Sequence, residues 1–442
     1  MNGVPMLHDV CVLSCYGLRD PHIASFINTL GTTLERRGIR LLVLSATAEP
    51  ELDALFIEIP YLLSQFDRAL HDIEQEAFHP IVATMLCEED QAEGAQDEAT
   101  IARGIAKCEA FYATIGTVIK PCVALLWNTT LPHGRIARNT LAAMGVPSYC
   151  LERGWLPQSF QLHATENNGY NDFFTDFTLN QSLPRMLAMY GELAEPFNEA
   201  QAYYLAHAVQ KYEAGDKLAP QALRDKYALG SDKLIVVFAA SVGSSVGSHQ
   251  TPSMAFSSPL FEGVSTALHL LYELLKPYPG VKVLVQEHPI QRAINKPAVL
   301  PPGFLRTDGE NIHTLLEAAD QYAFIGTTSV QFEALLHDKP RLSMSRHAPS
   351  ITGAAYGLVE EGDSAIAAWM HHTRAEQCRF NARALINYLC LGRLIRDEHL
   401  PSFIEHDVEH LANFIAQLSR PDSLSGDERI AAFIERIGVL LK

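Results

Sequence analysis

Hydroxyl groups and a carboxylate follow an apolar segment at residues 322–325, in an arrangement that suits phosphate binding. The segment is typical of a buried strand, and the residues after it have the apolar spacing of an amphipathic helix that packs on a sheet. The turn between them consists of Gly326, Thr327, Thr328 and Ser329. A helix that begins there presents unpaired N–H groups and the positive end of its dipole beside the hydroxyls, which suits a phosphate. Glu333 lies one turn into the helix, near enough to reach a ribose or sugar hydroxyl, although the same pattern is also a common helix cap that binds nothing.

A second polar group follows another apolar segment, at residues 281–286. The motif Gln-Glu-His-Pro ends this expected strand and contains His288 and Pro289. In a doubly wound sheet, ligands bind beyond the carboxyl ends of the strands. We therefore predict that the His288 imidazole and the three hydroxyls at residues 327–329 lie over one crevice, which indicates a nucleotide-sugar site. A histidine that only caps its strand is the alternative interpretation.

The first half of the chain also has polar residues where expected strands end. Apolar strands are expected at residues 9–14, 40–45, 121–127 and 148–151, with helices from about residue 21 and over 134–144. Asn128 follows the third strand, and Glu152 and Arg153 follow the fourth. Residues 163–174 contain Asn171 and Asp172 and are rich in Asn, Gly and Asp, which predicts a loop. Residues 50–118 alternate apolar and acidic positions and are expected to form helices.

This alternation of strands and helices predicts an α/β protein with two Rossmann-like domains that face a cleft, the B-type glycosyltransferase arrangement. A chain of 442 residues exceeds one ordinary core, so two domains are expected. We predict an N-terminal α/β acceptor-side domain at residues 1–182 and a helical connection at 183–228. A C-terminal α/β nucleotide-sugar-binding domain follows at 229–380, and helices at 381–442 pack back.

Composition restricts the ligands and the cellular setting. A net charge of -17 argues against nonspecific nucleic-acid binding, which needs a basic surface. No basic region precedes an apolar run at the start, and no apolar run approaches the roughly 20 residues that span a bilayer. We expect a cytoplasmic protein and leave peripheral contact with the inner membrane open. The eight cysteines and 18 histidines lack metal-site spacing, so we expect reduced thiols and no metal site.

Several segments, in order along the chain, resemble those of the capsule-polysaccharide biosynthesis proteins, a bacterial group that includes retaining β-Kdo transferases. They are residues 125–160 with Glu-x-Gly-x-Leu-Pro at 152–157, the loop at 167–172, the Gln-Glu-His-Pro motif, Ser/Thr-x-x-x-Glu-Ala-Leu-x-x-x-Lys-Pro at 329–340, and residues 383–395. Together they cover about half of the chain. The Glu-Ala-Leu element is shared by many B-type transferases, whereas Glu-x-Gly-x-Leu-Pro is the narrower indication.

The resemblance implies a metal-independent glycosyltransferase that moves a Kdo-like acidic sugar from a CMP-activated donor to a bacterial surface glycan or glycolipid, with no cofactor besides the donor. CMP leaves with a single phosphate, which an imidazole, hydroxyls and a helix terminus could stabilise without a metal; no Asp-x-Asp motif is present. Glu152 is the first candidate for acid/base catalysis and Asp172 the second. Donor contacts are expected from His288, Pro289, Gly326, Thr327, Thr328, Ser329, Glu333, Ser241 and Ser244, and acceptor-side contacts from Asn128, Arg153 and Asn171.

Other interpretations of these residues stay open. Residues 233–260, which include the first turn of the second domain, contain no Asp or Glu. The family resemblance implies a candidate nucleophilic carboxylate near this turn. The alternative interpretation of the serines in this segment is a flexible Gly/Ser loop. Glu152 could instead form an ion pair with Arg135 or Arg153, Asp172 could be a turn residue, and Asn128 could belong to core and turn. Two alternative functions follow: a B-type transferase that uses a UDP- or GDP-sugar, and an inactive nucleotide- or glycan-binding protein of the same fold.

Overall fold

The computed structural model of the chain places most of its residues in two compact units. The first unit contains Met1–Gly154, Gln158–Asp172 and Arg393–Lys442, and the second contains Trp155–Pro157 and Phe173–Gly392. The structure describes residues 8–15, 21–45, 52–53, 55–58, 106, 108–127, 129, 132–163, 183–207, 209, 215–239, 258–261, 263–288, 297–326, 328–396, 400, 403–419 and 425–440. The segment 183–228, expected to connect two domains, is grouped with the second unit.

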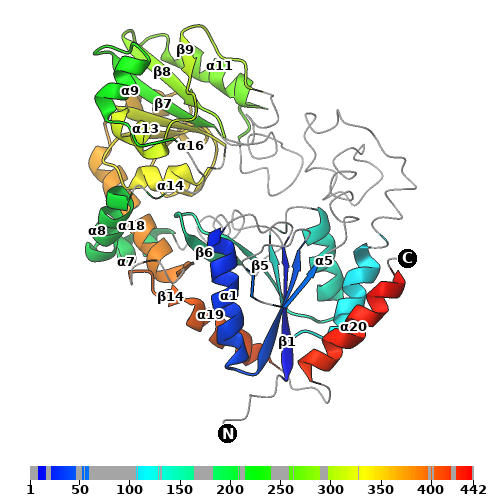
Figure 1. The fold of residues 1–442 in the computed structure, drawn as a ribbon. Helices are drawn as coiled ribbons and strands as arrows, with labels where there is room; N and C mark the ends of the chain where they lie inside the picture. Colours follow the sequence, from blue (N-terminus) through cyan, green and yellow to red (C-terminus); the bar gives the residue numbers. More distant parts are fainter. Residues whose placement is uncertain are drawn as a thin grey trace. The chain divides into compact units, whose positions relative to one another are not determined.

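The first unit is built on an eight-stranded sheet (Figure 1). Its strands are β1 (Asp9–Cys15), β2 (Ile39–Ser45), β3 (Leu55–Glu58), β4 (Val123–Trp127), β5 (Ser148–Arg153), β6 (Ser159–His163), β13 (Leu394–Arg396) and β14 (His406–Asp407). Their order is β14-β13-β6-β5-β4-β1-β2-β3. β6 pairs antiparallel with both of its neighbours, and the other pairs are parallel. The chain therefore fills one side of β1 with β2 and β3 before it returns to the other side with β4.

Helices cover both faces of this sheet, because successive residues of a buried strand point to opposite faces. Val10 and Val12 of β1 pack with the π-helix η2 (Ile115–Ile119), α5 (Pro132–Ala143) and α20 (Gly426–Leu440). Cys11 and Leu13 pack with α1 (Pro21–Glu35) and α19 (Val408–Leu418) on the opposite face (Figure 1).

A buried ion pair ties the end of the chain to this first sheet. Arg429 of α20 is 2% exposed, and its guanidinium lies 3.2 Å from the carboxylate of Asp9 at the start of β1. The same group donates a hydrogen bond of 2.6 Å to the carbonyl of Ile119. The expected packing of C-terminal helices against an α/β domain thus occurs here on the first unit.

The second unit is built on a six-stranded sheet in which every pair is parallel. Its strands are β7 (Lys233–Ala239), β8 (Val281–Gln286), β9 (Phe304–Arg306), β10 (Gln321–Ile325), β11 (Arg341–Ser343) and β12 (Tyr356–Gly357). Their order is β12-β11-β10-β7-β8-β9. When the strands of this sheet are counted in sequence from β7, their order from β9 to β12 is 3-2-1-4-5-6, the order of the Rossmann fold. The strands β3-β2-β1-β4-β5-β6 of the first unit have the same order.

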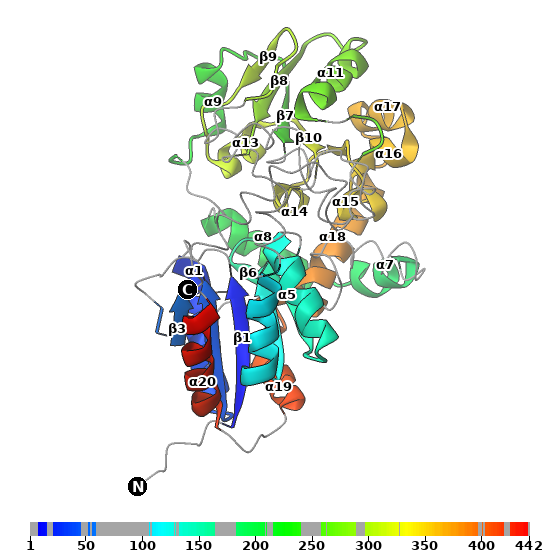
Figure 2. The same ribbon diagram turned by 90° about the vertical axis from the view of Figure 1, so that its right-hand side faces the viewer.

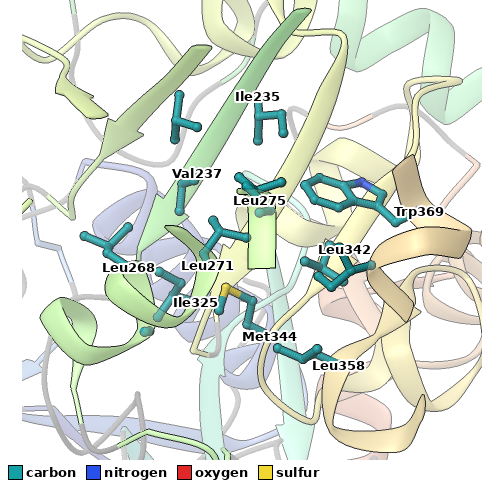
Figure 3. Close-up of a cluster of buried hydrophobic side chains, with 14 of the residues drawn as sticks. Ile235, Val237, Leu268, Leu271, Leu275, Ile325, Leu342, Met344, Leu358 and Trp369 are labelled. Carbon is teal, nitrogen blue, oxygen red and sulfur yellow. The ribbon is translucent and has the colours of Figure 1, made fainter. Parts of the chain in front are cut away.

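Helices also cover the two faces of the second sheet (Figure 2). The helices with residues in the two clusters that pack on this sheet are α9 (Pro220–Lys226), α11 (Val264–Leu275), α13 (Ile312–Ala318), α14 (Val330–Leu335), α16 (Leu358–Glu361), α17 (Ser364–Met370) and α18 (Ala375–Gly392). The unit also contains α7 (Leu183–Gly191), α8 (Glu195–His207) and α15 (Ala348–Ile351). Ile235 and Val237 of β7 pack with α11 and with Trp369 of α17 (Figure 3). Leu234 and Val236 pack with α9 and α13 on the other face.

The α/β fold class with two Rossmann-like units is confirmed, but two expectations for local structure are wrong. Residues 55–58, expected to be helical, form β3, which pairs in parallel with β2. The tail at 381–442, expected to contain only helices, includes β13 and β14. These strands have four, three and two residues, too few for an alternating pattern to be visible in sequence. Every helix in the described ranges is too short or too polar to cross a membrane.

Candidate functional site

The carboxyl ends of β7 and β10 form the point where the second sheet reverses its winding. From β7 the chain moves to β8 and β9 on one side, and then to β10 and β11 on the other. β7 and β10 pair up to Ala239 and Ile325, so the two strands end at the same level. Ligands of doubly wound sheets bind in the crevice outside such a point. The predicted contacts Ser241 and Ser244, which follow β7, lie outside the described residues.

The turn that follows β10 is held by a buried hydrogen-bond network. Gly326 has φ 73°, a conformation that favours glycine, and its N–H donates to Ser345 Oγ at 2.8 Å. Its carbonyl accepts from Gln331 Nε2 at 3.0 Å, and Gln331 Oε1 accepts from Ser343 Oγ at 3.2 Å. Gln331 is 1% exposed. The turn is therefore fixed to α14 on one side and to the end of β11 on the other.

Two of the three predicted hydroxyls of this turn can be located, and both belong to half-buried residues. Thr328 Oγ1 accepts a long hydrogen bond of 3.4 Å from the N–H of Val330, and Ser329 makes no side-chain capping bond. Thr327 lies outside the described residues. The helix that follows, α14, has only six residues, so its dipole contributes less than the longer helix expected from sequence would.

Glu333 lies in the interior of the second unit rather than on its surface. Its side chain is 3% exposed, and its carboxylate oxygen lies 4.0 Å from His313 Nε2. That nitrogen is 2.7 Å from the carbonyl of Val209, and burial lowers the pKa of His313, which favours a neutral ring. Contact between Glu333 and a ribose or sugar hydroxyl, the predicted role, requires the surrounding groups to move.

His288 lies two residues beyond the end of β8, at the same edge of the sheet. It is half-buried, and its neighbour Glu287 is 1% exposed. The Glu287 carboxylate accepts from the N–H of Ala298 at 2.6 Å and from Arg306 Nε at 2.5 Å, which fixes the backbone before His288. β7 lies between β8 and β10, so the His288 and Gly326 ends are about 10 Å apart at two strand spacings. Pro289 lies outside the described residues.

The Lys-Pro end of the Glu-Ala-Leu motif has a structural role. Lys339 Nζ donates to the carbonyls of Leu316 and Glu317 at 2.9 and 2.6 Å. These carbonyls belong to the last turn of α13, where a cation stabilises the helix end. Local sequence spacing does not reveal this contact, because Leu316 and Glu317 precede Lys339 by 23 and 22 residues.

The predicted catalytic and acceptor-side residues of the first unit are only partly located. Glu152 and Arg153 lie inside β5, not beyond its end as expected, because β6 extends the ladder by pairing with both of them. Both are half-buried. The predicted residues Asn128, Asn171 and Asp172 lie outside the described residues. Thr129, which follows Asn128 at the carboxyl edge of β4, is fully buried, and within the described part of the chain its hydroxyl has no hydrogen-bond partner.

The Glu-x-Gly-x-Leu-Pro element has a packing role that sequence reasoning missed. A Cβ atom on Gly154 would lie 2.0 Å from Ser159 Oγ, so only glycine fits where its N–H donates to the Ser159 carbonyl at 2.6 Å. Trp155, in the second unit, stacks at 4.7 Å on Phe332 of α14. The Tyr204 hydroxyl of α8 donates to the carbonyl of Pro157 at 3.0 Å. Trp155, the aromatic residue inside the motif, was the sequence feature that could have indicated this packing role.

The residues described here contain no group of three or more His, Cys, Asp or Glu side chains that could hold a metal ion. This observation concerns only the described ranges and does not identify the chemistry of the site.

No protein-family model matches this chain, and no curated protein matches its sequence. Among solved structures, an E. coli trehalose-6-phosphate structure bound with UDP-2-fluoro glucose is similar, with 11% identity and a TM-score of 0.49 over 93% of this chain and 100% of that one. Spinosyn rhamnosyltransferase SpnG has 13% identity and a TM-score of 0.37 over 93% and 100%. The S. aureus MnaA–UDP structure has 14% identity and a TM-score of 0.36 over 85% and 91%. Similarity at this level assigns neither an activity nor a ligand to this chain.

Proposed function

We propose that the protein is a metal-independent glycosyltransferase that transfers a Kdo-like acidic sugar from a CMP-activated donor to a bacterial surface glycan or glycolipid. One observation carries the proposal. Two motifs that are distant in sequence, one with His288 and one with Gly326 to Ser329, end at the carboxyl edge of a fully parallel sheet, on either side of β7. Such an edge is where doubly wound sheets bind nucleotides.

The polar groups at this edge suit the departure of a nucleoside monophosphate. In the transition state negative charge develops on the phosphate, and hydrogen-bond donors fixed in advance stabilise it. The His288 imidazole and the hydroxyls of Thr328 and Ser329 supply such donors, and the buried network around Gly326 holds the turn that carries two of them. Thr327 and Pro289, and Ser241 and Ser244 after β7, are proposed to complete the donor contacts.

The acid/base part of the proposal rests on the sequence resemblance. Glu152 is proposed to handle the acceptor proton, with Asp172 as the second candidate, and Asn128, Arg153 and Asn171 to contact the acceptor. Acceptors attached to lipid would bring the enzyme to the inner membrane as a peripheral protein.

The proposal is tested by thermal unfolding of the full chain with CMP, CDP, UMP, UDP and GDP at matched millimolar concentrations. A ligand at about 100 times its dissociation constant adds roughly 2.7 kcal/mol to the unfolding free energy of the unit that binds it. We expect CMP to stabilise the protein selectively, His288→Ala to remove this effect, and His269→Ala, at an exposed position on α11, to retain it. Release of CMP from CMP-Kdo is then assayed.

The same experiment separates the alternatives. Stabilisation by UDP or GDP in place of CMP overturns the donor assignment and identifies a transferase with a diphosphate donor. Nucleotide binding without turnover identifies the inactive binding protein, which the absence of any Asp or Glu at residues 233–260 favours. If no nucleotide alters unfolding, the proposed site is wrong.

A further inference from the structure

Arg346 is a half-buried residue in an otherwise buried segment that leads to the carboxyl edge of the second sheet. Residues 341–350 are all described, and Arg346 is the one residue among them that is not buried. Its side chain is 38% exposed. Its two chain neighbours, Ser345 and His347, are both buried, so the backbone position of Arg346 is fixed by packing.

The backbone ladder places Arg346 beside the turn at Gly326. β11 runs parallel to β10, and Ser343 pairs with Phe324. The ladder continues beyond β11: the N–H of Met344 donates to the carbonyl of Phe324 at 2.9 Å, and Ser345 Oγ accepts from the N–H of Gly326 at 2.8 Å. Arg346 follows immediately, one strand spacing of about 4.8 Å from the turn that bears the Thr328 and Ser329 hydroxyls.

The backbone around Arg346 is held on both sides. On one side Ser343 Oγ donates to the Ser345 carbonyl at 2.8 Å. On the other, the His347 ring packs against Phe332 and Trp155 with ring centroids 5.4 and 5.0 Å apart. These contacts fix the backbone on either side of Arg346, which is what a preformed binding residue requires.

The ion pair that Arg346 makes among the described residues is a loose one. Its Nε lies 3.4 Å from Glu360 Oε1, and that oxygen also accepts from Ser350 Oγ at 3.3 Å. Burial raises the pKa of Glu360, so its charged form is disfavoured there. Arg374, by contrast, binds both oxygens of Glu361 at 2.6 and 2.7 Å with a similar side-chain exposure of 41%. Among the residues that the structure describes, Arg346 has this one long contact, which leaves other N–H donors of its guanidinium for a planar anion.

We infer that Arg346 binds the negatively charged oxygen atoms of the donor, exchanging its contact with Glu360 for a bidentate contact to the anion. The inference rests on the proposed function, since it assigns the donor's charged group to the same edge of the sheet. The shared chemistry is an oxyanion, either the phosphate of the nucleotide or the carboxylate of an acidic sugar. Glu360 holds the guanidinium in place when no anion is bound.

The test compares Arg346→Gln with Arg374→Gln, which removes the same charge at a similar exposure. Dissociation constants of both variants and the unaltered chain are measured for CMP, cytidine, free Kdo and inorganic phosphate. We expect Arg346→Gln to weaken binding of the anionic probe by about 10- to 100-fold, the range for charge-assisted hydrogen bonds, and to leave cytidine binding unchanged. Loss for CMP and phosphate identifies the phosphate as the group bound, whereas loss for Kdo alone identifies the carboxylate.

A second variant changes affinity in the opposite direction. Glu360→Gln removes the charge that competes for the guanidinium, so binding of the same probe should tighten by about two- to fivefold, as expected for one partly exposed ion pair. A merely structural role for the pair would weaken binding in both variants. If Arg346→Gln fails to fold, Arg346→Lys keeps the charge without the planar fork and should weaken binding by a smaller factor.

The outcomes separate this inference from the proposed function. If CMP binds equally well to the unaltered chain, Arg346→Gln and Arg374→Gln, and Kdo and phosphate binding also do not depend on Arg346, the inference is overturned and the proposed function stands. If nucleotides fail to bind but phosphate binds in an Arg346-dependent way, Arg346 is an anion-binding residue, but its assignment to the donor and the proposed function are both overturned. If the unaltered chain binds no probe, both are overturned.

Discussion

The two sheets share one winding order but differ in how their carboxyl edges are finished. In each, the first strand is flanked by the second on one side and the fourth on the other. In the second unit the turn after the fourth strand, β10, is fixed by Gln331, Ser343 and Ser345. In the first unit the residue located after β4 is Thr129, whose hydroxyl is buried without a partner among the described residues. The same topology therefore carries a turn fixed by side-chain hydrogen bonds in one unit, whereas in the described part of the other unit the Thr129 hydroxyl lacks such a bond.

The units also differ in the charged and polar groups that they bury. The first depends on the buried Arg429–Asp9 pair, which connects sequence positions 420 apart. The second unit also has a buried carboxylate paired with an arginine, Glu287 with Arg306 at 2.5 Å. In addition it buries His337, His347 and the neutral hydrogen-bond network around Gly326. We therefore compare the Arg429–Asp9 ion pair of the first unit with the neutral buried groups of the second.

The largest effect is expected from Asp9→Ala in the first unit. The substitution leaves the Arg429 guanidinium buried without its carboxylate, which costs about 3–5 kcal/mol. Because two units need not unfold together, hydrogen exchange resolved by peptide is the measurement. Protection should fall in β1 and α20 and persist in β7 and β10. Equal losses in both units would contradict independent stabilisation.

The next largest effect is expected from Gln331→Met in the second unit. It leaves the Gly326 carbonyl without its buried donor and removes an acceptor of Ser343, at a cost of about 1–3 kcal/mol. Urea unfolding measures the loss, and CMP affinity should fall as well because the turn loses its support. Gln377→Met, at an exposed position on α18, is the matched control and should change neither quantity. Unchanged stability of Gln331→Met would show that the network does not hold the turn.

Acid sensitivity should distinguish the second unit through its buried histidines. Burial lowers the pKa of His337 and of His347 to about 3, from the ordinary value of about 6.5 for histidine. Above pH 6.5 these imidazoles are neutral in both the folded and the unfolded chain, so the shift does not affect the free energy of unfolding. As pH falls below 6.5, the imidazoles bind protons in the unfolded chain but not in the folded chain. The free energy of unfolding therefore decreases until the pH reaches about 3. His347→Phe keeps a ring against Phe332 and should reduce the loss between pH 7.5 and 5.5 by about 1 kcal/mol. An identical pH slope in variant and unaltered chain would contradict a neutral buried His347.

The smallest effect is expected from an exposed ion pair on the same helix as Arg429. Arg40 Nε donates to Asp427 at 3.0 Å, with the Asp427 side chain 56% exposed. Asp427→Asn should cost at most about 1 kcal/mol, since solvent screens such pairs. Comparison with Asp9→Ala, by the same exchange measurement, tests whether burial decides what each pair contributes to holding α20.

Several parts of the fold were predictable because they depend on local pattern. The apolar runs that form β1, β2, β4, β8 and β10 were found within one or two residues of their observed bounds. Each has at least five residues, of which three or more in succession are buried, so the apolar run is visible in the sequence. The turn at Gly326 was also predicted, since its residue types mark the end of a strand.

The site was less predictable, because side-chain surroundings depend on distant segments. Glu333 follows the turn in sequence as expected, yet α8 and α13 contribute to its burial, through Tyr204 and His313. Arg346 carried no sequence signal, since an arginine after a short strand is common on protein surfaces. Its position becomes informative only when its neighbours at residues 341–350 are known to be buried.

Local sequence alone thus determined the two α/β units, the principal strands and the polar turns at their ends, because backbone hydrogen bonding and hydrophobic burial follow from nearby residues. Tertiary structure decided the rest. It placed β13 beside β6 and Trp155 against Phe332. It also buried Glu333 and left Arg346 half-buried in an otherwise buried segment. Each of these contacts joins residues far apart in sequence, and its free energy exists only after the chain has brought them together.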